Sequence, residues 1–278
     1  MTTTVSKKTI QEQAKLIQKN SKLNYSQSLH KASQNLGFKN YDHHKMMKNF
    51  KIGVYSKKGG VGKTPISRNL AIDLNSDCYF RVEQSIDGDI CNQIFPKVKA
   101  FYNNMQNTNL STVYDLCSYI KLDNIDHILQ DIDIFIIPTR ANECQGIFTH
   151  TIRSSIKAIS KYNKPIIILS FGVHMRSRKK DIIILDNFIK TLDNSDNIYP
   201  FYMRGSPIYR DEYVYSKEIR MDFHINYKKS DLDSNAKSLI QIYNSSDKMK
   251  QKHKDIYAEY MQLLQLLETL ITKRNHND

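Results

Sequence analysis

The feature that most constrains the fold is a glycine-rich run, Lys57-Lys-Gly-Gly-Val-Gly-Lys-Thr64, set between two apolar segments. Residues 50–55 have the apolar content of a buried strand, and residues 66–74 have the spacing of a helix. The glycines let the backbone turn tightly, so that consecutive N–H groups point at one anion. The following helix would aim its positive N-terminal end at the same anion. The run therefore predicts a phosphate-binding loop at a strand-to-helix junction.

After this loop the apolar pattern alternates between strand and helix, which favours a parallel sheet with right-handed crossovers. Residues 132–137 and 165–169 are near-continuous apolar runs, which suit strands that are covered on both faces. The predicted fold is α/β, a mostly parallel sheet flanked by helices, with a small N-terminal helical appendage. We expect the further strands at 78–82, 110–114, 132–137 (ended by Pro138), 165–169 and 198–203, and the further helices at 147–159, 182–192 and 251–271.

Residues 1–48 differ in composition from the rest of the chain. They hold nine lysines against two acids, Glu12 and Asp42, and so supply +7 of the net charge of +13. Their spacing predicts helices near residues 10–17 and 26–36, and a third short helix at 40–48. This segment has two open interpretations, a helix-turn-helix-like unit that reads DNA and a docking or dimerisation appendage. We therefore divide the chain into an N-terminal segment, 1–48, and an α/β domain, 49–278.

Composition limits the location and the kinds of site. The chain has no run of roughly 18–20 apolar residues, and its N-terminus lacks the apolar stretch of a secretory signal. The four cysteines have no spacing typical of a zinc site or of a disulfide framework, so we expect free thiols in a cytoplasmic protein. A pI near 9.4 favours a polyanionic partner, nucleic acid or a membrane surface, although a lysine-rich proteome would give the same excess.

The spacing of the loop is close to the GxxxxGK[ST] pattern, but Lys57 stands where its first glycine normally lies. Lys-Gly-Gly-Val-Gly-Lys-Thr resembles the deviant Walker A motif of ParA/MinD-type ATPases. The resemblance implies that ATP and Mg²⁺ are the cofactors, that Lys58 reaches the nucleotide of a partner subunit, and that Lys63 reaches the β- and γ-phosphates. The nucleotide-binding residues implied are Lys58, Gly59, Gly60, Val61, Gly62, Lys63, Thr64 and Pro65.

Carboxylates are needed for the metal and for water activation. In proteins of this family an aspartate-rich switch follows the second strand. Here Glu83 stands nearest the strand end, and Asp87 and Asp89 follow it as the candidates to be counted with Lys58 and Lys63 as catalytic. Asp115 follows a short apolar strand and is the candidate Walker B aspartate, which with Thr64 would hold magnesium. Because sites of parallel sheets lie at the carboxyl ends of strands, Asp115 is preferred to the alternatives Asp131 and Asp133, which precede a strand.

The resemblance also implies an ATP-dependent homodimer that binds DNA non-specifically, with a ParB-like adaptor protein that stimulates ATP hydrolysis, so that a plasmid or similar replicon is partitioned. Such a protein would be cytoplasmic and nucleoid-associated, with no stable membrane association. The alternative hypothesis is a catalytically degenerate nucleotide-binding accessory protein. A third hypothesis is a MinD-like protein held to a membrane by its C-terminal helix. The candidate DNA contacts lie in two basic clusters: Arg176, Arg178, Lys179, Lys180, Lys228 and Lys229.

Overall fold

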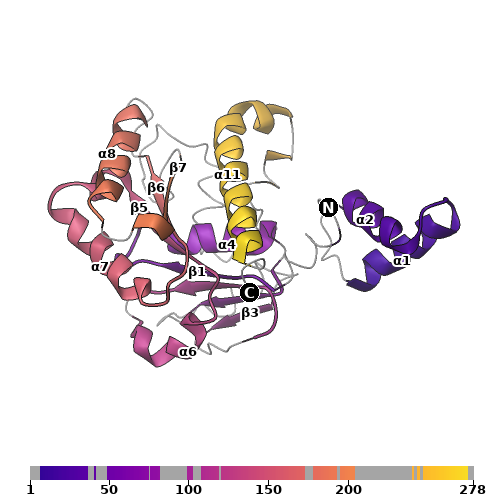
Figure 1. The fold of residues 1–278 in the computed structure, drawn as a ribbon. Helices are drawn as coiled ribbons and strands as arrows, with labels where there is room; N and C mark the ends of the chain where they lie inside the picture. The colour runs from indigo at the N-terminus through magenta and orange to yellow at the C-terminus, as the bar shows by residue number, and fades with distance from the viewer. Residues whose placement is uncertain are drawn as a thin grey trace, which may run out of the picture.

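A parallel β-sheet forms the centre of the α/β domain (Figure 1). Seven strands occur in the described part of the chain, in the order β3-β2-β4-β1-β5-β6-β7, and each neighbouring pair is parallel. The strands are β1 (Lys51–Tyr55), β2 (Cys78–Arg81), β3 (Lys99–Tyr102), β4 (Thr112–Leu116), β5 (Ile134–Arg140), β6 (Ile166–Phe171) and β7 (Ile198–Met203). The computed structural model describes residues 7–36, 41, 49–74, 76–81, 99–102, 108–118, 120–172, 178–192, 195–203, 240, 243–244 and 247–274.

Helices cover both faces of this sheet, which confirms the predicted fold class. One apolar core lies between the sheet and helices α4 and α11, and the other lies between the sheet and helices α6, α7 and α8. The α-helices are α1 (Lys7–Lys19), α2 (Tyr25–Asn35), α4 (Lys63–Asp73), α6 (Asp126–Leu129), α7 (Thr149–Ser160), α8 (Arg178–Lys190) and α11 (Asp247–Arg274). Short 3₁₀ helices are η1 (Leu122–Ile125), η2 (Ala141–Cys144), η3 (Gly146–Phe148) and η5 (Ser195–Asn197).

The long helix α11 packs on the sheet through one apolar side, as its sequence spacing predicts. Figure 1 shows it, in yellow, beside α4. Full burial of a leucine or isoleucine side chain contributes about 1.5–3 kcal/mol, so this face anchors the helix firmly to the domain. The buried residues of that side are Ile256, Tyr260, Leu263, Leu264, Leu267, Leu270 and Ile271.

Strand β5 does not end before Pro138, which corrects the expected boundary. The N–H of Phe135 donates to the carbonyl of Pro165, on the β6 side, so residue 138, of opposite parity, directs its nitrogen toward β1. The pairing of β5 with β1 has already ended at Ile136 opposite Val54. Proline lacks the donor that a central strand normally needs, but Pro138 lies beyond the last residue of β5 that pairs with β1, so no bond of that ladder is lost. The strand therefore continues to Arg140 along β6 alone.

Strands β4 and β3 also differ from the sequence prediction. Strand β4 runs from Thr112 to Leu116, two residues later than expected, so Asp115 lies within the strand. Strand β3, Lys99–Tyr102, was not predicted. It pairs only with β2 at the edge of the sheet, and an edge strand does not need the continuous apolar run by which central strands are recognised.

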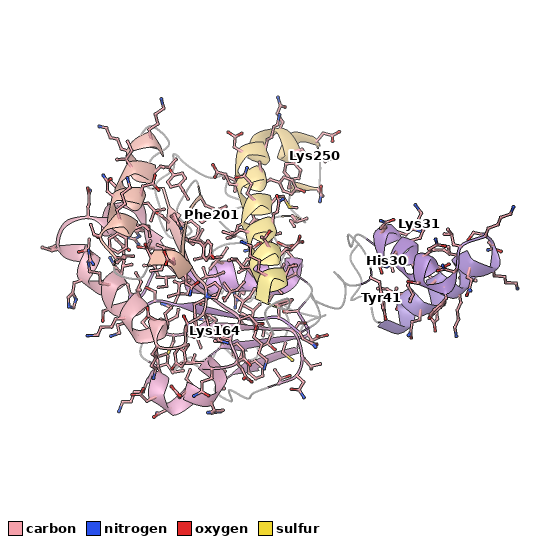
Figure 2. The ribbon with its side chains drawn as sticks, in the orientation of Figure 1. His30, Lys31, Tyr41, Lys164, Phe201 and Lys250 are labelled. Atoms are coloured by element: carbon pink, nitrogen blue, oxygen red, sulfur yellow. The ribbon has the colours of Figure 1, made fainter. Side chains whose placement is uncertain are left out.

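Helices α1 and α2 pack on each other through a small apolar core of their own, formed by Ile10, Ala14 and Ala32. The N-cap of α2 is Asn24, whose side chain accepts from the N–H of Gln27 at 2.9 Å. Figure 2 shows His30 and Tyr41 in this unit, where the Tyr41 N–H donates to Nδ1 of His30. Apart from Tyr41, the predicted third helix at 40–48 lies outside the described residues.

Candidate functional site

The loop of residues 57–64 joins the carboxyl end of β1 to the start of α4, which confirms the strand-to-helix junction. Gly60 and Gly62 have φ angles of 69° and 94°, in the left-handed region that side chains with a Cβ disfavour. Gly62 is the N-cap of α4, with Lys63 and Thr64 in the first turn. The free N–H groups of that turn and the glycine loop therefore face the same carboxyl edge of the sheet, as an anion site requires.

Lys63 folds back over this loop. Its ammonium group donates to the main-chain carbonyl of Lys58 at 2.7 Å and to the hydroxyl of Ser118 at 3.2 Å. Burial lowers the pKa of Lys63, and the charge of Asp115 opposes that shift. A desolvated ammonium group whose present partners are mostly neutral has much to gain from a phosphate.

Asp115 and Thr64 lie side by side at the same edge. The Thr64 hydroxyl donates to Oδ2 of Asp115 at 2.6 Å, and the Asp115 side chain is only 3% exposed. The register of β1 and β4 places Asp115 opposite Val54, just before the phosphate-binding loop begins. A hydroxyl beside a carboxylate offers the hard oxygen ligands that magnesium prefers, so these two residues fit the predicted metal site. The structure shows no cluster of three or more His, Cys, Asp or Glu side chains that could hold a metal anywhere in its described residues.

The rejected alternatives lie at the opposite end of the sheet. The side chain of Asp133 accepts from the main-chain N–H of Lys51 at 2.6 Å, and Asp131 pairs with the Lys51 ammonium group at 3.0 Å. Lys51 is the first residue of β1, whereas the loop follows its last residue. Neither acid can therefore reach a phosphate held at residues 57–64.

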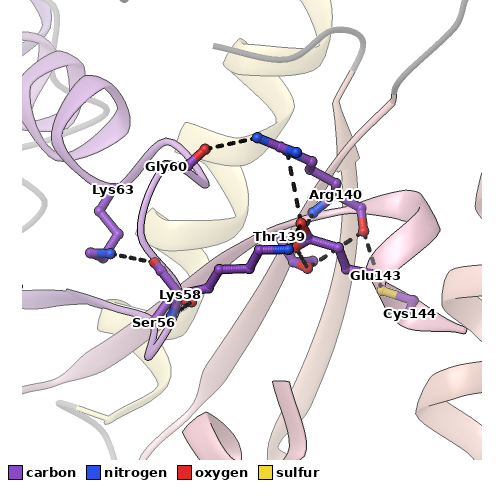
Figure 3. Close-up of polar contacts among 8 residues, drawn as sticks. All are labelled: Ser56, Lys58, Gly60, Lys63, Thr139, Arg140, Glu143 and Cys144. Carbon is purple, nitrogen blue, oxygen red and sulfur yellow. Dashed lines mark hydrogen bonds and ion pairs between the residues drawn. The ribbon is translucent and has the colours of Figure 1, made fainter. Parts of the chain in front are cut away.

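A second buried carboxylate, Glu143, reaches the loop from the other side (Figure 3). It lies in η2, which follows β5, and its Oε1 is 2.5 Å from the ammonium group of Lys58. Its Oε2 accepts from the Thr139 hydroxyl at 3.1 Å and from the Arg140 N–H at 3.2 Å. The side chain of Lys58, 35% exposed, is thus held within its own chain.

Arg140 adds a further cation at the glycine loop. Its guanidinium group donates to the carbonyl of Gly60 at 3.2 Å and lies 3.8 Å from Glu143 (Figure 3). Neither Glu143 nor Arg140 was predicted from the sequence. The available signal was their position directly after the apolar run of β5, at the carboxyl edge where sites of parallel sheets are built.

The remaining predicted residues divide into described and undescribed ones. Val61 is buried and Gly59 exposed in the loop, and Pro65 follows Thr64 in the first turn of α4, where proline is tolerated. Arg178 begins α8, and Lys179 and Lys180 are exposed in its first turn. The residues that lie outside the described part are Asp87, Asp89, Arg176, Lys228 and Lys229.

Two general expectations concern thiols and membranes. Cys78 and Cys144 are buried free thiols, and Cys117 is a half-buried one, as expected of the cysteines that the structure describes. None of the helices in the described ranges has both the length and the apolar content to cross a bilayer.

Comparisons with known proteins give likeness to solved structures alone. No protein-family model matches the chain, and no curated protein matches it. Similar structures include MinD cell division protein from Aquifex aeolicus (11% identity, 77% of this chain and 96% of that one, TM-score 0.44). A putative plasmid partition protein from Borrelia burgdorferi B31 bound to AMPPNP is 13% identical over 77% of this chain and 99% of that one, with a TM-score of 0.42. Apo McdA from Cyanthece is 11% identical over 76% of this chain and 99% of that one, with a TM-score of 0.37.

At identities and TM-scores this low, the likeness assigns no activity. The functional proposal rests on the loop and its surroundings.

Proposed function

We propose that this chain is a ParA/MinD-type ATPase, which binds ATP with Mg²⁺, dimerises, and binds DNA non-specifically to partition a plasmid or similar replicon. One observation carries the proposal. The sequence Lys-Gly-Gly-Val-Gly-Lys-Thr, residues 58–64, lies between a central parallel strand and a helix, with Thr64 bonded to Asp115 beneath it. A glycine loop, a lysine, a hydroxyl and a carboxylate in this arrangement are the parts from which phosphoryl-transfer sites are built.

Each group has a defined task in this proposal. The loop amides and the N-terminal end of α4 bind the phosphate oxygens, and Lys63 leaves the Lys58 carbonyl to bind the β- and γ-phosphates. Thr64 and Asp115 hold Mg²⁺, which when bound offsets the charge of the phosphates. Lys58 turns away from Glu143 and reaches the nucleotide of the partner subunit. Catalysis then comes from positioning and charge neutralisation.

DNA binding would use the basic surface. Lys179 and Lys180 are exposed in the first turn of α8, where positive side chains oppose the helix dipole and so do not stabilise the helix. This placement is better explained by a polyanionic partner. In the proposal these two lysines act with Arg176, Arg178, Lys228 and Lys229. Residues 1–48 form a separate basic module, and a ParB-like adaptor stimulates hydrolysis by the domain 49–278 on nucleoid DNA in the cytoplasm.

A specific observation favours the alternative of a nucleotide-binding accessory protein without turnover. The two buried carboxylates at the loop, Asp115 and Glu143, already accept from several donors each, so neither is poised to activate water. Water activation would depend on Asp87 or Asp89. In the described residues β2 ends on a cation, Arg81, rather than on an acid.

The test measures ATP hydrolysis and DNA binding together. DNA affinity should rise with ATP relative to ADP or no nucleotide, and should fall steeply with salt. Lys58→Ala and Lys63→Ala should remove the ATP effect, whereas Lys121→Ala, which changes an exposed lysine outside residues 57–64, should keep it. Equal DNA binding in all nucleotide states would refute the partition function. The accessory protein would be selected if the native chain binds ATP but does not hydrolyse it when DNA is present, and if Asp87→Asn and Asp89→Asn leave ATP binding and the absence of hydrolysis unchanged.

A further inference from the structure

Two side chains of β2 and one from the first turn of α4 meet at the Asp115 carboxylate. Residues Tyr79 and Arg81 are two apart on β2, so both point to the same face of the sheet. The register of β2 and β4 places Arg81 directly opposite Asp115. The Tyr79 hydroxyl donates to Oδ2 of Asp115 at 3.0 Å, and Nε of Arg81 lies 3.6 Å from the same oxygen. Thr64 donates to that oxygen as well, at 2.6 Å.

The pair formed by Arg81 and Asp115 is almost fully removed from water. Their side chains are 7% and 3% exposed. A guanidinium group stays charged at any pH that a folded protein tolerates, and a buried charge is retained only where it is paired. The site therefore has a permanent cation next to the carboxylate that faces the phosphate-binding loop.

A cation at this place changes what the site requires of a metal. A bound divalent ion is normally the largest positive charge near a carboxylate of this kind, and its affinity depends on the net negative charge around it. Arg81 neutralises part of that charge before any metal arrives.

We propose that Arg81 is a positioning residue of the nucleotide site, which fixes Asp115 beside Thr64 and lets the loop bind a nucleoside triphosphate with only weak dependence on magnesium. The proposal rests on the proposed function, because it needs a triphosphate at residues 58–64. It goes beyond it by naming a fixed cation that the sequence motif does not contain.

The experiment measures ATP affinity by titration calorimetry, once with excess MgCl₂ and once with excess EDTA. For the native chain the two dissociation constants should differ by less than about tenfold, because Arg81 supplies charge without the metal. Arg81→Gln should weaken ATP binding in EDTA, whereas its affinity in magnesium should recover. The ratio of the dissociation constant in EDTA to that in magnesium should therefore grow by about tenfold or more. Arg81→Lys keeps the charge and should stay close to the native ratio. Arg153→Gln, which changes an exposed arginine bonded to Thr191, should not alter it.

The outcomes separate this inference from the function on which it rests. No ATP binding in either buffer would refute the nucleotide site itself. If the native chain binds ATP in magnesium but its affinity is more than about a hundredfold lower in EDTA, the role of Arg81 alone would be overturned. An unchanged ratio in a folded Arg81→Gln protein would overturn it too. Circular dichroism establishes folding, and if Arg81→Gln does not fold, the native ratio and Arg81→Lys decide the question.

Discussion

The ammonium group of Lys58 lies 2.5 Å from Oε1 of Glu143, so the lysine that the sequence motif singles out is paired within its own chain. Glu143 is held in turn by the Thr139 hydroxyl and the Arg140 N–H. In the proposed dimer Lys58 must reach the nucleotide of the partner subunit. The pair with Glu143 would then compete with dimerisation, since the Lys58 side chain must turn away from Glu143 to reach the partner.

Replacing Glu143 by glutamine should therefore favour the dimer. The amide keeps the size of the side chain and an oxygen that can accept from Thr139, but the ion pair with Lys58 is lost. We expect the dissociation constant of the dimer with a non-hydrolysable ATP analogue to fall several-fold, about tenfold if the pair is worth about 1.4 kcal/mol. Sedimentation velocity measures this. Asp196→Asn, at an exposed carboxylate, is the control, and unchanged or weaker association of the Glu143 variant contradicts the competition.

Removing the Tyr79 hydroxyl should lower stability. Tyr79→Phe keeps the buried ring but takes away a hydrogen bond to the Asp115 carboxylate, and bonds to charged groups contribute about 1.5–3 kcal/mol. We expect the free energy of unfolding in urea to fall by about that amount, with the slope of the transition unchanged. Tyr162→Phe, whose hydroxyl bonds to Asp126 at the surface, should change it by less than about 0.5 kcal/mol. Equal losses for the two variants would count against a special role for the Tyr79 contact.

The sequence predicted the framework of the site because local chemistry determines it. The loop at 57–64, the strand before it and the helix after it follow from glycine content and apolar spacing. Asp115 could be preferred to Asp131 and Asp133 since the carboxyl ends of parallel strands meet at one edge. The register of β4 on β1 agrees with that choice.

The partners of these residues could not be predicted, because they depend on register between distant segments. Arg81 meets Asp115 only because β2 pairs with β4 in one particular alignment. Glu143 meets Lys58 because β5 continues through Pro138 and delivers η2 to the loop. The spacing rules mark that proline as a strand end, so the continuation of β5 to Arg140 was not predicted.

Thiol reactivity gives an independent check of the site's packing. Burial, with the nearby charge of Glu143, raises the pKa of the Cys144 thiol to about 12. Almost no thiolate is then present at pH 8, and the thiolate is the reactive form. We expect iodoacetamide to label half-buried Cys117 well before Cys144, as followed by peptide mass spectrometry. Rapid labelling of Cys144 in the folded protein would show that the segment carrying Glu143 is open to solvent.

Acid stability should depend on Asp126. Hydrogen bonds from Lys161, Tyr162 and Gln130 lower the pKa of its carboxyl group from 3.8 to about 2. A pKa that is depressed in the folded state contributes stability above the unfolded value, and that contribution is lost as the pH falls through the folded value. The Tm difference between the native chain and Asp126→Asn should therefore shrink between about pH 4 and pH 2. A difference that stays constant over this range contradicts the bonding of Asp126. High salt should reduce the Tm difference, since the Asp126 carboxylate is exposed and its charge is screened.

The central claim is that residues 57–64 enclose the phosphates of a nucleotide, and calorimetric titration of ATP with magnesium tests it most directly. The account predicts saturable binding at one site per chain for the native protein and for Lys121→Ala. For Lys63→Ala it predicts a loss of at least about tenfold in affinity, because a charge-assisted contact to phosphate is removed. Absence of heat from the folded native protein, or equal affinity in Lys63→Ala, would contradict the claim.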